Sequence, residues 1–563
     1  MTTHTMLLSK RFLQRRFTTN NKFKFIPGYK LKCGLEIHTQ LNTKKKLFSS
    51  SINHHPSSSE TPNSHTNFFD LSLPGTQPIL NHESILFALK LSLALNSKIN
   101  LNSQFDRKHY FYADQPQGYQ ITQHYSPFAK HGSLTLYHDI DNIKEPTKKI
   151  NIIQLQIEQD TARSIYLQPP QNLTLLDFNR SNVPLIELVT EPEFNDIDQI
   201  KAFIRKYQNL IRHLHISTGD LEDGAMRIDV NVNVNEHPRV ELKNLPNTTS
   251  IIKAIKYEYT QQVQTLLNQK NGDVFEGGTK SWDGQKTIKL RNKETMVDYR
   301  YMPDPELPTI TLSTELIESI RKTMPMLPDD IINMLVSHPY CLTMKDAKIL
   351  TINSNSNSTS NKSAENEVSI YNHEDLRGYY LETCNEFLQL SNTGQKVNEK
   401  SPLKLPTNWI IHELIGNLKK LSISFNEFNA KCMNPPTFAE FLTLIKQNVI
   451  SNSSAKFLLF EILKQFKDSS SMMTKMEIDL PKLIKKYNLE TIDESNEKGQ
   501  EFINEICNSV IEQTSNDLIT EIKMGGKNKE KKLKYLIGQS MKLSKGKISP
   551  KEIESCLNKI LFL

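Results

Sequence analysis

The sequence lacks the glycine-rich loops by which many nucleotide-binding enzymes are recognised. Glycine accounts for only 19 of the 563 residues. No G-x-x-x-x-G-K-[ST] segment is present, which excludes a P-loop kinase, and there is no glycine-rich dinucleotide-binding loop. The absence of Gly-x-Ser-x-Gly and of a Gly/Ser-rich amidase segment argues against a serine-nucleophile hydrolase.

Paired cysteines and long apolar runs are also missing. The six cysteines stand far apart and form no C-x-x-C pair, which argues against a structural zinc site and against a disulfide framework. No apolar run is long enough to span a bilayer. The cysteines are Cys33, Cys341, Cys384, Cys432, Cys507 and Cys556.

Acidic residues are absent from the N-terminal segment. Between Met1 and Leu35 there is no Asp or Glu, whereas eight lysines and arginines occur there. Leu7, Leu8 and Phe12 can form the apolar side of a short amphipathic helix. This composition predicts a mitochondrial transit peptide over residues 1–27 and a location in the matrix; a disordered basic arm is the alternative.

Length and overall composition are those of a globular protein with several domains. A chain of 563 residues is too long for one core, and it is 37% hydrophobic and 23% charged. The formal net charge of +7 is a modest excess that favours a polyanionic partner.

The segment from Met226 to Asn244 predicts a β-hairpin with one polar face. Apolar residues alternate with Arg, Asp and Asn from residue 227 to residue 234, and after a turn the alternation continues through Glu241 and Lys243. A solvated sheet face would explain the pattern as well. Asn and Asp, however, are unfavourable in strands, so their repetition favours a functional reason.

Further acids, amides and one histidine occupy alternate positions of the other predicted strands. Glu36 and His38 share a face of the first strand, and Glu158 lies near the end of another. Oxygen ligands with one imidazole, facing inward, would suit Mg²⁺ and phosphate chemistry. The cations Arg180, Lys243, Arg291 and Arg300 could then neutralise phosphoryl oxygens; all come from the same strand-rich region.

Helical spacing of apolar residues predicts helices over residues 197–213, 250–267 and 409–421, the second of them with Thr248, Thr249 or Ser250 as its cap. From Leu316 onward the periodicity is helical almost throughout. A Ser/Asn tract predicts a disordered insertion over residues 353–367, and Asn434-Pro435-Pro436 marks a predicted boundary. Between Lys523 and Lys551 there are ten lysines and one acid, Glu530. An apolar stripe in this run predicts a packed helix whose outer face carries the lysines; it consists of Leu533, Leu536, Ile537 and Met541. Such a basic helix suits a phosphate backbone, and a merely solubilising face is the alternative.

Long motifs, in order along the chain, resemble the GatB/GatE family, which includes the B subunits of aspartyl/glutamyl-tRNA(Asn/Gln) amidotransferases. They are G-L-E-I-H-T-Q-L (34–41), L-P-G (73–75), R-K-H-Y-F-Y-A-D-Q-P-Q-G-Y-Q-I-T-Q (107–123), D-F-N-R-S-N-V-P-L-I-E-L-V-T-E-P (177–192), R-I-D-V-N-V-N-V (227–234), V-E-L-K-N-L (240–245), K-E-T-M-V-D-Y-R-Y-M-P-D-P-E-L-P (293–308), W-I-I-H-E-L (409–414) and L-I-G-Q-S-M-K-L-S-K-G-K-I-S-P (536–550). The resemblance covers nearly the whole chain after the presequence.

The resemblance implies an α+β fold: a cradle-like catalytic domain with a mixed or antiparallel sheet (28–310), a helical domain (311–435) and a small helical YqeY-like tail that binds tRNA (436–563). It implies a ligase that uses ATP to phosphorylate the γ-carboxyl of Glu-tRNA(Gln). Ammonia from a separate amidase subunit then displaces the phosphate, and a small third subunit completes the complex. Residue by residue, it implies metal ligands Glu36, His38 and Glu158; catalytic residues Asp229, Asn231, Glu241, Lys243, Arg180 and Arg300; ATP-binding residues Asn179, Arg291 and Lys293; and Mg²⁺ as the cofactor.

Two departures from the family pattern stand out. The E-E-D-A-G-K-like motif reads E-Q-D-T-A-R (158–163), and the Q-E-T-R segment reads G-G-T-K (277–280). These departures concern individual site residues. A non-catalytic tRNA-binding scaffold and a tRNA synthetase are the alternative functions, and Asp-tRNA(Asn) is a candidate additional substrate.

Overall fold

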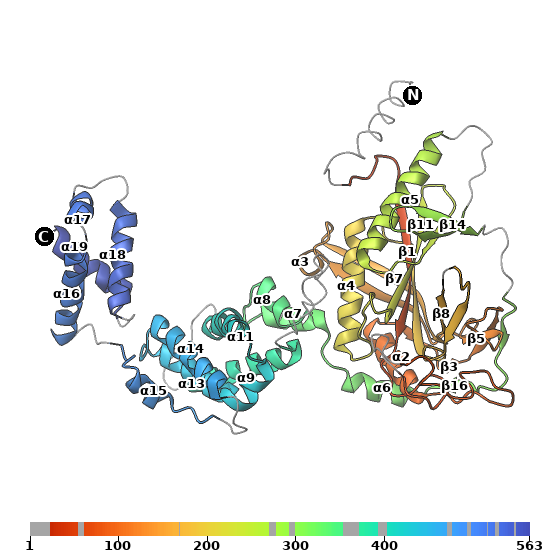
Figure 1. Cartoon of the computed structure of the whole chain (residues 1–563), viewed down its shortest axis with the longest axis horizontal. Helices are drawn as coiled ribbons and strands as arrows, with labels where there is room; N and C mark the ends of the chain where they lie inside the picture. The colour runs from red at the N-terminus through yellow and green to blue at the C-terminus, as the bar shows by residue number, and fades with distance from the viewer. Residues whose placement is uncertain are drawn as a thin grey trace. The chain divides into compact units, whose positions relative to one another are not determined.

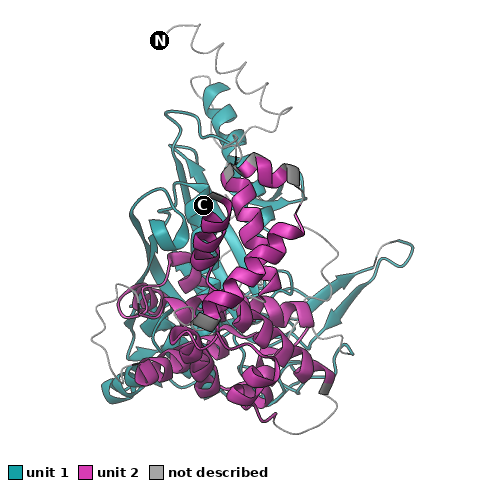
Figure 2. Ribbon diagram, turned by 90° about the vertical axis from the view of Figure 1, so that its left-hand side faces the viewer, with its two compact units in different colours: residues 1–328 teal, residues 329–563 magenta. Residues whose placement is uncertain are grey.

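The computed structural model describes most of the chain (Figure 1). Its two compact units, Met1–Pro328 and Asp329–Leu563, are coloured separately in Figure 2. The predicted insertion and residues 1–22 lie outside the described residues, and within those described no helix has the length and apolar character needed to cross a bilayer. The described residues are 23–53, 61–167, 169–268, 277–291, 299–352, 371–391, 402–469, 476–491, 497–514, 516–523, 529–544 and 548–562.

A nine-stranded mixed sheet forms the centre of the first unit. Strands β12 and β13 run parallel, and the other described neighbours in this sheet run antiparallel. The predicted hairpin is confirmed, because β11 pairs with β12 through Val232–Val240, Asn231–Glu241 and Val230–Leu242. In spatial order the strands are β14 (Thr287–Arg291), β13 (Gly278–Trp282), β12 (Val240–Lys243), β11 (Met226–Val234), β1 (Leu31–Gln40), β10 (Pro184–Thr190), β7 (Thr147–Gln159), β6 (Ala129–Tyr137) and β2 (Lys98–Ile99).

One face of this sheet is apolar and is packed against helices α2 (His82–Ala94), α4 (Ile197–His213) and α5 (Thr248–Asn268) (Figure 1). Ile37, Val230 and Val232 point to this side and are fully buried. The predicted helix 197–213 has the bounds of α4. Helix α5 was predicted to be capped by Thr248, Thr249 or Ser250, but the side chain of Asn247 accepts the Ser250 N–H at 2.8 Å and caps it instead. Successive side chains of a strand point to opposite faces, so the polar residues that alternate with these buried ones lie on the face of the sheet away from the helices.

Among the described residues, three smaller sheets and two short helices complete the first unit. The small three-stranded sheet is the one that matters for the site, because Thr122 of its strand β5 donates to Glu158 at 3.2 Å. The elements are β4 (Asp106–His109), β5 (Tyr119–Thr122) and β15 (Met302–Pro303); β3 (Asn102–Ser103) and β16 (Ile310–Thr311); β8 (Arg163–Tyr166) and β9 (Thr174–Asp177); and helices α3 (His138–Asp141) and α6 (Thr314–Thr323). Helix α7 (Pro328–Val336) begins at the last residue of this unit and otherwise belongs to the second.

Residues 23–27, which were assigned to the transit peptide, pack against the first unit. The rings of Phe23 and Phe25 lie 5.9 and 5.0 Å from that of Tyr259, edge to face. The Ile26 N–H donates to the Tyr259 hydroxyl at 3.0 Å. The part of the predicted presequence that the structure describes is therefore folded onto α5, which the composition of the segment did not indicate.

The second unit is helical, as predicted from residue 316 onward. The predicted helix at Trp409 begins with π-helical turns (η3, Asn408–Leu414) and continues as α11 (Ile415–Leu421). Helix α13 (Pro435–Lys446) packs against α9 (His373–Ser391), so Asn434 caps a helix inside this unit. The remaining helices before the tail are α8 (Met344–Ile349), α10 (Lys404–Thr407), α12 (Phe425–Glu427), η4 (Phe428–Cys432), α14 (Asn452–Ser469) and α15 (Leu480–Lys486).

The C-terminal helices share a hydrophobic core of their own. Leu533 and Leu536 of α18 are buried in one cluster with Ile503 and Leu557, and Ile537 packs against this cluster. The predicted apolar stripe of the basic helix is therefore confirmed, and the fold is maintained by all four helices together. They are α16 (Glu497–Glu512), α17 (Asn516–Lys523), α18 (Lys529–Leu543) and α19 (Pro550–Phe562).

Candidate active site

The polar face of the central sheet carries two neighbouring groups of ligand-type side chains. One consists of His38, Glu158 and Glu187, and the other of Glu36, Asp229 and Glu241. In each group one ligand atom per residue lies within 4.8 Å of the others. We call them the histidine group and the carboxylate group.

Strand register explains how the histidine group forms. His38 of β1 stands directly opposite Glu187 of β10, and Glu158 lies two residues from the partner of Glu187 on β7. The His38 Nε2 atom is 3.3 Å from Glu158 and 3.8 Å from Glu187. The sequence predicted His38 and Glu158 as ligands of one site, and the structure places them together. Glu187 was not predicted as a ligand. The signal for it was present, because Glu187 stands between the apolar residues Ile186 and Leu188, as expected for a polar position on a half-buried strand.

Electrostatics within the histidine group favour a protonated imidazole. Burial by itself lowers the pKa of His38, but the hydrogen bond to Glu158 and the negative charges of Glu187 and Glu158 outweigh it and raise the pKa to about 9. Burial and the charge of Glu158 raise the pKa of Glu187 to about 7. Glu158 is itself desolvated, yet His38 holds its pKa below the usual value. At neutral pH the group thus contains an imidazolium and one readily protonated carboxylate.

The carboxylate group lies on the same face of the sheet and extends from β1 toward β11 and β12. Glu36 stands opposite Asp229 of β11, and Glu241 of β12 pairs with Asn231. The Asn231 amide donates to Glu36 at 2.7 Å, and the Lys243 ammonium lies 2.6 Å from Asp229 and 3.1 Å from Glu241. The structure therefore brings together four predicted catalytic residues and the predicted ligand Glu36. Glu36 and His38, which were predicted to bind one ion, fall into different groups, and their metal binding stays a prediction.

The two groups differ in how well they fit a hard divalent cation. The carboxylate group offers three carboxylates and one ammonium, a charge of −2 that matches Mg²⁺, and its ligand atoms are oxygens. The histidine group, with neutral imidazole, also carries −2, but binding there must displace the proton of His38. Both donor sets fit a divalent ion, the carboxylate group with less reorganisation.

Cations lie at the edge of the histidine group. The Arg227 guanidinium, opposite His38, is 2.8 Å from Asp160. Arg180 donates to the carbonyls of Thr161 and Ala162 at 2.9 and 2.7 Å and lies 3.8 Å from Asp160. Asp160 thus holds both guanidinium groups in place, a role that the sequence did not indicate.

The other predicted residues lie in different surroundings. Asn179 accepts the His65 N–H at 2.8 Å and donates to the Thr61 carbonyl at 3.0 Å, so its amide connects two loops. Arg300 is exposed, has a left-handed backbone (φ 44°) and accepts from the ring of His109 through its carbonyl. Arg291 ends β14, and Lys293 lies outside the described residues. Binding of ATP by Asn179, Arg291 and Lys293 stays a prediction.

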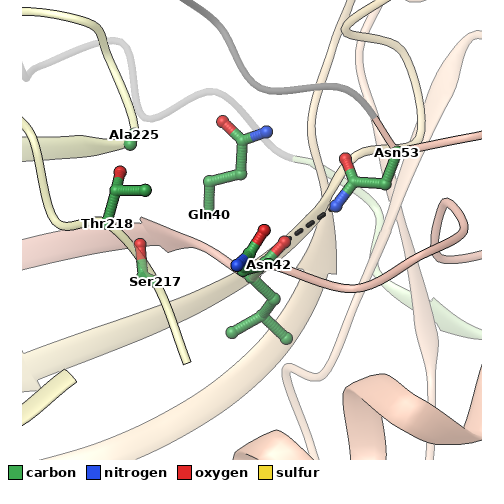
Figure 3. Close-up of a pocket in the computed structure, with 7 residues that line it drawn as sticks. Gln40, Asn42, Asn53, Ser217, Thr218 and Ala225 are labelled. Atoms are coloured by element: carbon green, nitrogen blue, oxygen red, sulfur yellow. Dashed lines mark hydrogen bonds between the residues drawn. The ribbon is translucent and has the colours of Figure 1, made fainter. Parts of the chain in front are cut away.

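A small polar pocket lies beyond the C-terminal end of β1 (Figure 3). Asn53 donates from its amide to the Leu41 carbonyl at 2.8 Å at one side of it. Its lining consists of amides, hydroxyls and small apolar groups without a charged side chain, so it is not suited to a phosphate. The lining residues are Gln40, Leu41, Asn42, Asn53, Ser217, Thr218 and Ala225.

Fold and site together define a class of protein. It has an α+β catalytic domain with two acidic ligand groups on one sheet face, followed by a helical region. The description "GatB/GatE catalytic domain" fits residues 31–318, and "GatB domain", of the YqeY type, fits residues 394–561. The chain belongs to the GatB/GatE family.

Similar full-length proteins come from yeasts. The chain is 53% identical over 558 residues, 99% of both chains, to a protein of Zygosaccharomyces rouxii that is named as the B subunit of the mitochondrial glutamyl-tRNA(Gln) amidotransferase. Proteins with the same name show 54% identity over 538 residues in Saccharomyces cerevisiae, 95% of each chain, and 52% over 557 residues in Kluyveromyces lactis, 99% of each. These relatives confirm the predicted mitochondrial location. All six cysteines are free thiols, in agreement with the prediction of no disulfide framework.

Proposed function

We propose that this chain is the B subunit of a mitochondrial glutamyl-tRNA(Gln) amidotransferase and serves mitochondrial translation. In this reaction ATP phosphorylates the γ-carboxylate of glutamate on Glu-tRNA(Gln). Ammonia, released from glutamine by the amidase subunit of the complex, then replaces the phosphate and yields Gln-tRNA(Gln). The observation that carries the proposal is the pair of acidic groups on one face of β1, with Lys243 and Arg227 beside them.

The first step brings two anions together, because a carboxylate must attack the γ-phosphoryl group of ATP. Mg²⁺ bound by Glu36, Asp229 and Glu241 would supply charge neutralisation for the phosphate oxygens. Lys243 adds one fixed positive charge at the same place, and Asn231 holds the Glu36 carboxylate at 2.7 Å. Arg227 and Arg180, held by Asp160, are the guanidinium groups suited to the phosphates or to the substrate carboxylate.

The second step releases a proton, because ammonia loses one hydrogen when it becomes the amide nitrogen. Glu187 has a pKa of about 7, which is suited to accepting a proton near neutral pH. His38 and Glu158 surround it, so a proton taken up by Glu187 stays within the histidine group. In this step Glu187 would accept the proton, and His38 and Glu158 would hold Glu187 in position.

The experiment uses the complex purified with its partner subunits. Glu36→Gln removes one carboxylate of the carboxylate group and retains an amide that can pair with Asn231. We expect the variant to assemble and to hydrolyse glutamine, but to lose transfer of the ATP γ-phosphate to Glu-tRNA(Gln), measured with radiolabelled ATP. Normal amidation by this variant would overturn the proposal and favour a tRNA-binding scaffold. Asp-tRNA(Asn) in the same assay tests the additional substrate.

A further inference from the structure

A continuous row of ring contacts reaches the protein surface from the neighbourhood of the histidine group. Thr122, two residues before His124 of this row, donates to Glu158 at 3.2 Å. The rings of Tyr299 and Tyr301 lie 6.0 Å apart, edge to face. Tyr301 stacks on His124 with centroids 3.8 Å apart and planes 9° apart, and His124 contacts Tyr125 at 4.9 Å. We call these four residues the aromatic row.

The row is held rigidly by the small three-stranded sheet. Its residues follow β5 or precede β15, and the His109 N–H donates to the Tyr299 carbonyl at 2.8 Å. The Tyr125 hydroxyl donates to the Tyr301 carbonyl at 3.1 Å. Fixed rings lose little conformational freedom when a ligand stacks on them, which makes such a surface favourable for binding.

The members of the row have different surroundings. His124 is exposed, and Tyr125 at one end is 57% exposed. Tyr301 is partly buried, and burial together with the negative charges of Glu187 and Glu158 raises its pKa. The row therefore connects solvent with the acidic groups.

Cations accompany the aromatic row. The Lys108 ammonium lies 4.8 Å above the ring of Tyr299. Arg300, between Tyr299 and Tyr301 in sequence, is exposed. Rings that alternate with cations are the composition of surfaces that bind single-stranded nucleic acid, because bases stack on the rings and phosphates pair with the cations.

The substrate of the proposed function must place a nucleotide at this position. Its reacting carboxyl belongs to an amino acid esterified to the terminal ribose, so only four C–C bonds of ~1.5 Å, at most roughly 6 Å of chain, separate the ester carbon from the reacting carboxyl. The terminal nucleotides are unpaired, and proteins recognise unpaired bases by stacking. Once the carboxyl is at the acidic groups, the last bases lie next to them.

We propose that the aromatic row is the stacking surface for the unpaired 3′-terminal nucleotides of the aminoacyl-tRNA. This inference rests on the proposed function and adds the residues that hold the reactive end of the substrate. The row orients the ester so that the amino-acid side chain enters between the two acidic groups. Affinity for the body of the tRNA comes from other surfaces.

The test uses the assembled complex and Glu-tRNA(Gln) that carries the fluorescent base 2-aminopurine in place of its terminal adenine. Stacking quenches this base. We expect quenching on binding to the unchanged complex, and loss of quenching with Tyr125→Ala and with His124→Ala. Each substitution should also raise KM for Glu-tRNA(Gln) about tenfold. Tyr125→Phe keeps the ring and should retain quenching, and Tyr166→Ala, at another exposed tyrosine, on β8 outside the row, is the matched control.

The outcomes separate this inference from the proposed function. Amidation by the unchanged complex without quenching, or full quenching in both alanine variants, overturns the aromatic row as a stacking surface and leaves the proposed function intact. If the unchanged complex forms no Gln-tRNA(Gln), the proposed function fails, and this inference fails with it. Loss of a partner subunit from both alanine variants, with Tyr125→Phe intact, would identify the row as a protein interface and overturn the proposal.

Discussion

Replacing Asp229 by Asn should separate catalysis from stability at the carboxylate group. The change keeps the shape of the side chain and removes one charge. Asp229 is 2.6 Å from the Lys243 ammonium, and its carboxylate lies within 4.8 Å of those of Glu36 and Glu241. The substitution therefore removes the attraction to Lys243, a smaller attraction to Arg227 and two repulsions at once.

The magnitudes show that these terms nearly cancel. With an effective dielectric of ~20, a pair of charges at 2.6 Å attracts with a gross energy of ~6 kcal/mol. Two like-charged pairs no more than 4.8 Å apart repel by at least ~3.5 kcal/mol each. Lys243 keeps Glu241 as a partner at 3.1 Å. The free energy of unfolding should thus change by no more than about 1 kcal/mol, which moves Tm by about 2 °C in a domain of this size.

The effect on phosphate transfer should be much larger, because the carboxylate group loses one of three charged ligands. We expect kcat/KM for amidation to fall at least about 100-fold, a loss of ~2.7 kcal/mol of transition-state stabilisation. Amidation of Glu-tRNA(Gln) with ATP and ammonium chloride measures it without dependence on glutamine hydrolysis. Asp283→Asn, in the exposed turn between β13 and β14, is the control and should leave both quantities unchanged.

Two results would refute this reasoning. Amidation within twofold of the unchanged complex would show that the charge of Asp229 has no part in the reaction. A fall in Tm of more than about 10 °C would show that the Asp229–Lys243 pair stabilises the fold and that the activity loss reports unfolding.

Further predictions concern the core, the histidine group and the tail. Val232→Asp places an unpaired charge at a fully buried position and should cost several kcal/mol (order of magnitude), so the complex should fail to yield folded subunit in a thermal unfolding assay; a Tm near the unchanged value would contradict this. If Mg²⁺ binds the carboxylate group as proposed, its affinity should not follow the protonation of His38 and Glu187, whose pKa values are raised to about 9 and about 7, and calorimetry in two buffers should detect no proton release between pH 7 and pH 9. Proton release, or an affinity that increases from pH 6 to pH 9, would place the ion in the histidine group, because protons compete with a metal ion there. Because α16 to α19 share one core, deletion from residue 523 onward would also expose apolar surface, so the double substitution of the exposed Lys531 and Lys534 by Gln is the cleaner test. Binding of tRNA should weaken, and the slope of the logarithm of the binding constant against the logarithm of the salt concentration should become shallower by about 0.7–0.9 for each phosphate that is no longer paired with a lysine. An unchanged dissociation constant at two salt concentrations would mean that the lysines only solubilise the helix.

Much of the architecture could be predicted because period-two and helical patterns depend on local sequence. The alternation along β1, β11 and β12 identified the strands and the face on which Glu36, His38 and Asp229 lie. The spacing in α4 gave its bounds. These features follow from which side of an element must be buried, and that is determined by the order of apolar and polar residues.

The composition of each ligand group was decided only by tertiary structure. Glu36 and His38 share a strand face, yet each is completed by a different neighbour: Asp229 of β11 beside Glu36, and Glu187 of β10 opposite His38. Register between strands depends on the whole sheet, so a sequence pattern cannot state which side chains meet. The same holds for the packing of residues 23–27 on Tyr259 and for Asp160 between two arginines, because both contacts join segments far apart in the chain.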